Sequence, residues 1–91
     1  MLEYHAVYFK EPDGWFVVEL VDFPGVCSQG KTLRSARFMI RDALKLMAEC
    51  LVEEGSSLPK PNPQAKPTMG KKPAYLEKVR LTTRFQTPVT K

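Results

Sequence analysis

The sequence predicts an α+β fold in which a small antiparallel or mixed sheet carries one long helix on one face. Three observations predict it. Two β-branched and aromatic runs flank a turn-forming segment, apolar residues then recur at helical spacing between positions 33 and 51, and apolar alternation returns near the C-terminus. The predicted order of elements is therefore β-β-β-α-β, and 91 residues fit one domain.

The first two strands are predicted to form a hairpin. Residues 4–10 and 15–21 are the strands, and residues 11–14 (Glu-Pro-Asp-Gly) join them. Asp13 favours a turn, and Gly14 can adopt the positive φ that a short hairpin loop requires. Both faces of the two strands are apolar, so something must cover the second face, and another subunit is one candidate.

A short third strand over residues 26–29 and a long helix are predicted to follow. Pro24 and Gly25 end the second strand, Thr32 suits the helix N-cap, and Gly55 suits the position just after the helix. The apolar stripe expected to pack on the sheet consists of Leu33, Ala36, Ile40, Ala43, Leu44, Met47 and Leu51. Met39, Leu46 and Cys50 are expected to widen it along one flank, whereas Asp42, Lys45, Glu49 and Glu53 form the solvent face around Phe38.

A proline-rich arm separates the helix from the last strand. We predict a core over residues 1–58, the arm over residues 59–74, and a strand and tail over residues 75–91 that complete the same single domain. The strand is expected over residues 75–85, with Val79 and Leu81 on its core face. Because so long a loop is unusual in a compact domain, we hypothesise that this strand is exchanged between subunits.

Charge is distributed unevenly along the chain. Residues 1–55 contain six Lys or Arg against nine Asp or Glu, whereas residues 56–91 contain eight against one. Nucleic-acid contacts are therefore expected in the C-terminal part, where Lys78, Arg80 and Arg84 alternate along the predicted strand and are the candidate nucleic-acid-binding residues. A solvated edge that resists aggregation is the competing interpretation.

Patterns for catalysis are weak. Residues 25–32 fit the nucleotide-binding pattern G-x-x-x-x-G-K-[ST], but a predicted strand inside the pattern does not suit a loop that wraps phosphate. Glu19, Asp22 and Asp42 are interpreted as surface charges because they are not expected to converge on a metal, and His5 as a structural residue. We therefore predict no enzymatic activity, no cofactor and no metal.

Two further observations concern the cysteines and the location of the protein. Cys27 and Cys50 form no metal-binding pair and are interpreted as small buried hydrophobes. No apolar run approaches the roughly 20 residues of a membrane helix, and the N-terminus lacks the charge pattern of a secretion signal. The expected location is therefore the cytoplasm.

The order of turns resembles the HicB-like antitoxin family. An Asp-Gly turn joins two strands, Phe-Pro-Gly ends the second, Gly-x-Thr follows four residues later, and Gly-x-x-Leu-Pro-x-Pro comes after the helix. The residues that match the family motif are Asp13, Gly14, Pro24, Gly25, Gly30, Thr32, Pro59 and Pro61. The resemblance covers residues 4 to about 61 and concerns scaffold positions.

The resemblance implies a partial RNase H-like fold, a homodimer or tetramer, and neutralisation by occlusion of a small basic RNase toxin, a HicA-like mRNA interferase. Many relatives append a DNA-binding module, for which the residues after the arm are expected to be too few. Trp15 and Phe38 are the candidate partner-binding residues, since large aromatic side chains in polar surroundings anchor interfaces. Cover of Phe38 by the arm of its own chain is the alternative.

Two other functions stay open at this point. The chain fits a solitary homo-oligomeric regulatory or structural protein of the same fold. It also fits a nucleic-acid-binding module that uses the basic C-terminal strand, for which steep salt dependence would be the signature.

Overall fold

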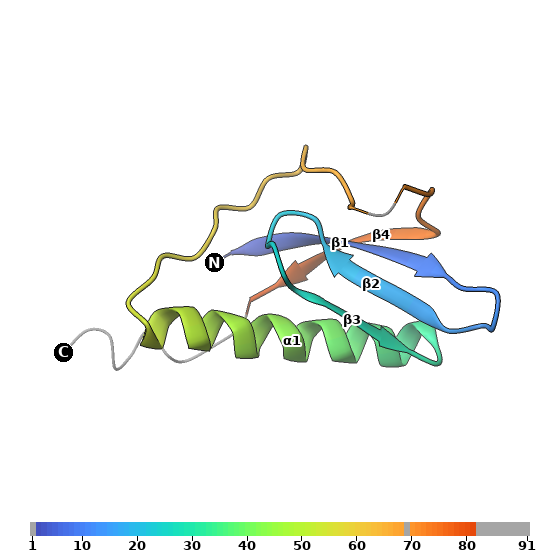
Figure 1. The fold of residues 1–91 in the computed structure, drawn as a ribbon, viewed down its shortest axis with the longest axis horizontal. Helices are drawn as coiled ribbons and strands as arrows, with labels where there is room; N and C mark the ends of the chain where they lie inside the picture. The colour runs from blue at the N-terminus through green and yellow to red at the C-terminus, as the bar shows by residue number, and fades with distance from the viewer. Residues whose placement is uncertain (1, 69, 82–91) are drawn as a thin grey trace.

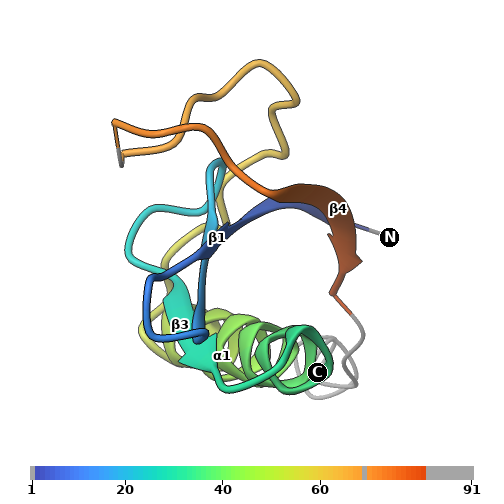
Figure 2. The same ribbon diagram turned by 90° about the vertical axis from the view of Figure 1, so that its right-hand side faces the viewer.

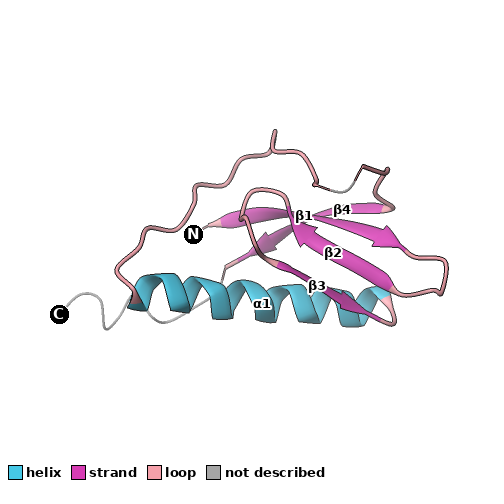
Figure 3. Ribbon diagram, viewed as in Figure 1, coloured by secondary structure: helices cyan, strands magenta, loops and turns pink. Residues whose placement is uncertain are grey.

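The computed structural model describes residues 2–68 and 70–81, and these form one four-stranded sheet and one helix. The elements are β1 (Glu3–Lys10), β2 (Phe16–Leu20), β3 (Cys27–Gly30), α1 (Leu33–Glu53) and β4 (Tyr75–Arg80). The sheet has the order β3-β2-β1-β4, and all neighbouring strands are antiparallel (Figure 1, Figure 3). The α+β class and the β-β-β-α-β order are confirmed, and the likeness to RNase H stays a prediction.

The turn between β1 and β2 is closed by its own backbone and by one side chain. The Gly14 N–H donates to the Glu11 carbonyl at 2.9 Å, and the Trp15 N–H donates to Oδ1 of Asp13 at 3.0 Å. Gly14 has a φ of +93°, which a residue with a side chain adopts only with strain. Local chemistry thus closes the hairpin.

The start of α1 combines a capping box with close packing against β3. Oγ1 of Thr32 accepts from the Ser35 N–H at 3.0 Å, and the Thr32 N–H donates to Oγ of Ser35 at 3.1 Å. At Gly30, a Cβ atom would come within 2.5 Å of the Ala36 backbone nitrogen. Gly30 therefore lets the first turn of the helix approach the sheet.

The main core lies between α1 and the face of the sheet that it covers. From the helix, the fully buried side chains are Ala36, Ile40, Leu44 and Ala48. From the sheet, the main core residues are Tyr4, Ala6, Tyr8, Val18 and Leu20. Val79 and Leu81 extend this core at exposed fractions of 5% and 7%, as their alternation predicted.

The arm covers the opposite face of the sheet. Figure 1 and Figure 2 show it running over the side away from α1. Val7 and Phe9, whose side chains point to this face, are both 1% exposed. Val7 lines a groove together with Pro63 and Pro67 of the arm, and Lys71 Nζ lies 6.0 Å from the Phe9 ring centroid. The arm of the same chain therefore covers the second sheet face.

The prediction that Met39, Leu46 and Cys50 widen the core stripe is wrong. Met39 and Leu46 are 40% and 59% exposed, and Cys50 is exposed as well. The helix packs against β3 and β2, and β3 is an edge strand, so the helix flank away from β4 projects beyond the sheet. Cys27 is also exposed on this edge strand, so the interpretation of both cysteines as buried hydrophobes is wrong.

The structure describes the first part of the predicted last strand. β4 pairs with β1 of the same chain from Glu3 opposite Arg80 to Tyr8 opposite Tyr75. The remainder of the predicted strand, with Arg84, lies outside the described residues. Exchange of this strand between subunits stays a prediction. In the described part of the chain, no helix is both long and apolar enough to cross a membrane.

Candidate functional site

A buried carboxylate, Asp22, ties the arm to the sheet. Its side chain is 0% exposed and accepts from the backbone N–H groups of His5 at 2.9 Å and Asn62 at 2.8 Å. Its second oxygen lies 2.7 Å from Nδ1 of His5. The interpretation of Asp22 as a surface charge is therefore wrong, because a carboxylate this deep must have its hydrogen-bonding capacity filled. His5 has the structural role that the sequence predicted.

A second buried carboxylate, Glu19, holds the arm further along. Glu19 is 9% exposed, and its oxygens accept from the backbone N–H and the hydroxyl of Thr68 at 3.1–3.3 Å. At the start of the arm, the Tyr4 hydroxyl donates to the Pro59 carbonyl at 2.6 Å. These contacts fix the arm to the sheet and assign Glu19 a structural role in place of the predicted surface charge.

The three carboxylates considered for metal binding do not converge. Glu19 and Asp22 face the arm, whereas Asp42 is exposed on α1, which covers the opposite face of the sheet. Among the residues that the structure describes, no cluster of three or more His, Cys, Asp or Glu side chains suits a metal ion. Residues 27–30 of the nucleotide-binding pattern form β3, and Nζ of Lys31 lies 5.9 Å from the Trp15 ring centroid.

A polar contact fixes α1 to β4 on the helix side of the sheet. Nε of Arg37 donates to both carboxylate oxygens of Glu77 at 3.0 Å. Hydrogen bonding from Arg37 lowers the pKa of Glu77, although partial burial opposes this effect. Burial, followed by the negative charge of Glu77, raises the pKa of Tyr8 to about 12. The Arg37–Glu77 pair thus attaches α1 to β4, and sequence patterns alone did not reveal this contact.

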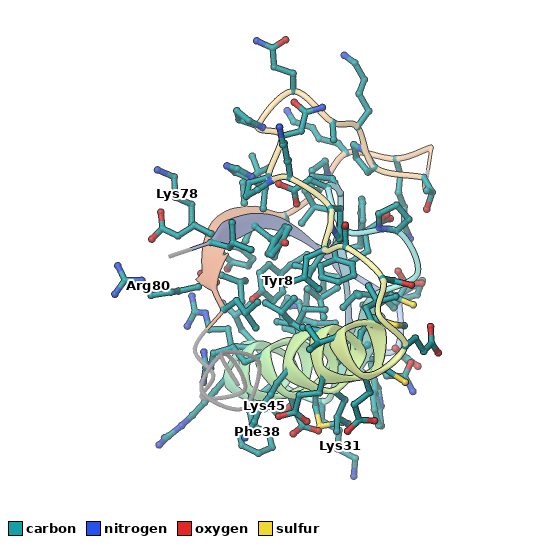
Figure 4. The ribbon with its side chains drawn as sticks, turned by 90° about the vertical axis from the view of Figure 1, so that its left-hand side faces the viewer. Tyr8, Lys31, Phe38, Lys45, Lys78 and Arg80 are labelled. Carbon is teal, nitrogen blue, oxygen red and sulfur yellow. The ribbon has the colours of Figure 1, made fainter. Side chains whose placement is uncertain are left out.

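The two aromatic candidates for partner binding lie in different parts of the molecule. Phe38 is 61% exposed on the outer side of α1, and the arm runs over the other face of the sheet, so cover of Phe38 by the arm is wrong (Figure 4). Trp15 is only partly exposed and lines a shallow depression with Val17 and Gln29 at the hairpin end. The structure does not bring Trp15 and Phe38 together.

One exposed flank of α1 is apolar and bordered by acidic residues. Met39, Leu46 and Cys50 lie on it, on the side away from β4. Helical spacing places Asp42, Glu49 and Glu53 beside these residues. We call this surface the acidic flank. Sequence reasoning assigned these three apolar residues to the core, because a helical pattern does not report that α1 packs over an edge strand.

The opposite flank of α1 is basic and faces β4. Arg34, Arg41 and Lys45 are exposed along it. A depression of about 170 Å³ between α1 and β4 is lined by Phe38, Arg41, Asp42, Lys45, Arg80 and Leu81. Lys78 and Arg80, the described members of the predicted basic strand, project outward from β4 (Figure 4). We call this surface the basic flank.

Comparison with known proteins identifies the family. The model of a family described as HicB_like antitoxin of bacterial toxin-antitoxin system matches residues 4–87. The chain belongs to the HicB-like antitoxin family. The match extends beyond residue 61, where the motif-based resemblance ended, and therefore includes β4. A relative, UPF0150 protein Ta0767 of Thermoplasma acidophilum, is 31% identical over 61 residues, which are 67% of this chain and 88% of that protein.

Solved HicB structures share the fold. The N-terminal domain of Burkholderia pseudomallei antitoxin HicB superposes with a TM-score of 0.69 at 22% identity, over 90% of this chain and 100% of that domain. A longer chain of the same antitoxin gives 0.70 at 27% identity; the match covers 88% of this chain but only 63% of that one. A chain of the HicA3 and HicB3 toxin-antitoxin complex gives 0.57 at 28% identity, over 66% of this chain and 69% of that chain.

Proposed function

We propose that this chain is an antitoxin that binds a small basic HicA-like mRNA interferase and neutralises it by occlusion. The family match over residues 4–87 carries the proposal. The similarity to a chain of the HicA3 and HicB3 complex supports a toxin as the partner. Occlusion needs a complementary surface on the antitoxin and no reacting group.

We further propose the acidic flank as the surface that receives the toxin. Leu46, which is 59% exposed, offers an apolar anchor at the centre of the acidic flank. Met39 lies two helical turns before it on the same side of α1. The bordering carboxylates of Asp42, Glu49 and Glu53 complement a basic protein. The basic flank would repel the same partner, and so would the lysine-rich arm.

Self-association is the second part of the proposal. β3 and β4 are the two edge strands of the sheet, and an open edge can pair with another chain. A homodimer or tetramer would cover such an edge. Light scattering of the purified protein measures its mass, and a monomer at micromolar concentration would contradict this part alone. If the partner cleaves mRNA, the antitoxin must meet it in the cytoplasm, and we therefore propose a cytoplasmic location.

The function is tested by co-expression of the chain with the small basic reading frame next to its gene. We expect a complex that survives purification at moderate salt, and we expect RNA cleavage by the isolated toxin to stop when the chain is added in equimolar amount. Toxin cleavage that continues in excess antitoxin would contradict the function.

The docking surface is tested by a matched pair of charge insertions. Leu46→Arg should weaken the complex at least about tenfold, because it places a positive charge and a larger side chain in the centre of the contact. Leu76→Arg is the control, since Leu76 is 73% exposed on β4 and lies outside the acidic flank. Equal loss of affinity in both variants would exclude the acidic flank and leave the function itself intact.

A further inference from the structure

The basic flank contains a row of cations along one side of α1. Arg34, Arg37, Arg41 and Lys45 follow one another at intervals of three and four residues, so they lie on one side of the helix over roughly 16 Å. Arg37 is held by Glu77, whereas Arg34, Arg41 and Lys45 form no ion pair within residues 2–68 and 70–81. Their charges are therefore available to an anion.

A second element adds to this row. Arg80 of β4 lines the depression that Arg41 and Lys45 line from the helix. Arg80 contacts Glu3 at 3.3 Å, but the two side chains are 60% and 40% exposed, and ion pairs in contact with water contribute little. Cations thus converge on the depression from two elements that are distant in sequence.

An exposed aromatic ring borders the same depression. Phe38 is 61% exposed and shares the depression with Arg41, Lys45 and Arg80. The aromatic face is a platform for an unpaired base, and a row of cations beside it can follow a phosphate backbone. We propose that the basic flank binds single-stranded nucleic acid, with Phe38 stacking on a base and Arg34, Arg41, Lys45 and Arg80 contacting phosphates.

The location of this surface separates it from the proposed toxin contact. The basic flank faces β4, whereas Met39, Leu46 and Cys50 of the acidic flank lie on the other side of α1, so the two surfaces share Asp42 at their border. The site also differs from the predicted stripe of Lys78, Arg80 and Arg84 on the last strand alone. Asp42 is the single acidic residue that lines the depression, and its carboxylate opposes a phosphate there.

The electrostatic part is tested by fluorescence anisotropy with a labelled single-stranded RNA of about 12 nucleotides, titrated with the full chain at several salt concentrations. In the triple variant R34Q/R41Q/K45Q, the slope of log affinity against log salt should be less steep by about 2, since each phosphate contact of a single strand contributes about 0.7. The matched control K60Q/K66Q/K72Q removes the same charge from the arm and should keep most of the slope. Equal losses in both triple variants would overturn the proposal.

The stacking part is tested at Phe38. Phe38→Ser should weaken binding by roughly tenfold at unchanged salt slope, and Phe38→Tyr should restore it, because stacking needs a ring and not a charge. Leu46→Ser is the control for loss of an exposed apolar side chain on the other flank. Asp42→Asn should strengthen binding by roughly two- to fivefold. Unchanged affinity in Phe38→Ser would overturn the stacking contact.

Comparison of nucleic acids completes the test. We expect single-stranded RNA and single-stranded DNA of the same sequence to bind, with tighter RNA binding only where a 2′-hydroxyl is contacted. Duplex DNA should bind at least about fivefold more weakly, because its bases are not free to stack. Duplex binding as tight as single-strand binding would overturn the proposal, as would an absence of binding at low salt. Circular dichroism of each variant verifies that the helix is retained.

Discussion

The two faces of the sheet are covered in different ways. On one face, α1 packs apolar side chains such as Ile40 and Leu44 against the strands and leaves them fully buried. On the other, the arm has no regular hydrogen bonding of its own and lies over two open depressions of about 370 and 360 Å³. What orders the arm is a pair of buried carboxylates, Asp22 and Glu19, that accept hydrogen bonds from its backbone.

The difference shows how an irregular proline-rich segment can serve as a cover. Backbone N–H groups must find acceptors when they are removed from water, and a helix provides them internally. The arm does so in one short turn, where Asn62 accepts from Gln64 and Ala65, and β2 and the turn after it supply further acceptors from their side chains. We therefore expect the packing of α1 on the sheet to be sensitive to changes in side-chain volume. The attachment of the arm should instead be sensitive to changes in charge and hydrogen bonding.

The largest expected effect is on the helix side. Ile40→Ala should lower the free energy of unfolding by about 2–5 kcal/mol, because Ile40 is 0% exposed and the cavity cannot be filled by its neighbours. Urea unfolding followed by circular dichroism measures the change. Leu46→Ala, on the same helix but 59% exposed, should change it by less than about 0.5 kcal/mol. Equal effects would contradict the assignment of the core.

Asp22→Asn should have the next largest effect, by about 1–3 kcal/mol, and it should act on the arm side. An amide offers one acceptor in place of two and turns an N–H group toward another donor, either His5 or Asn62. Besides global stability, limited trypsin cleavage in the arm after Lys71 should become faster; Lys60, Lys66 and Lys72 each precede a proline, and trypsin does not cleave there. Asp42→Asn, an exposed position on α1, is the control. Unchanged cleavage would show that Asp22 does not hold the arm.

A pH dependence should appear on the helix side at alkaline pH. The pKa of Tyr8 is raised from 10.0 to about 12 in the folded chain, so folding favours the neutral phenol. This contribution is fully present below pH 10 and is lost as pH rises toward 12, by up to about 2 kcal/mol. Urea unfolding at a series of pH values measures it. In Tyr8→Phe, the free energy of unfolding should fall less steeply with rising pH. An identical fall would contradict the assignment of this pH dependence to Tyr8.

The smallest expected effect is at Thr68. Thr68→Val removes the hydroxyl that donates to Glu19 and keeps the backbone N–H, so the free energy of unfolding should fall by about 0.5–1 kcal/mol. The effect on trypsin cleavage in the arm should exceed the effect on global stability. A loss of stability as large as that of Asp22→Asn would indicate that the Glu19 and Asp22 contacts hold the arm equally.

The sequence predicted the regular elements well because their signals are local. The turn at Gly14, the cap at Thr32 and the helical stripe through Ile40 depend on neighbouring residues, and each lies where it was expected. The alternation of Val79 and Leu81 also identified the core face of the last strand.

The failures concern long-range placement. Asp22 and Glu19 were interpreted as surface charges because their partners lie 40 and 49 residues away in the arm. Exposure of Leu46 depends on the position of the helix over an edge strand, which no helical pattern reports. The candidate binding surfaces were only partly predicted for the same reason: Phe38 was identified, but its proximity to Arg80 requires the packing of α1 beside β4.

The arm's anchors recognise its backbone. Asp22 accepts from the main-chain N–H of Asn62, and Glu19 accepts from that of Thr68 and from its hydroxyl, so few arm side chains are needed for attachment. Any residue other than proline supplies the N–H at these two positions. Among the intervening positions, the exposed residues Gln64 and Lys66 are consequently suited to the insertion of a protease site or an affinity tag, because they do not line the groove over Val7.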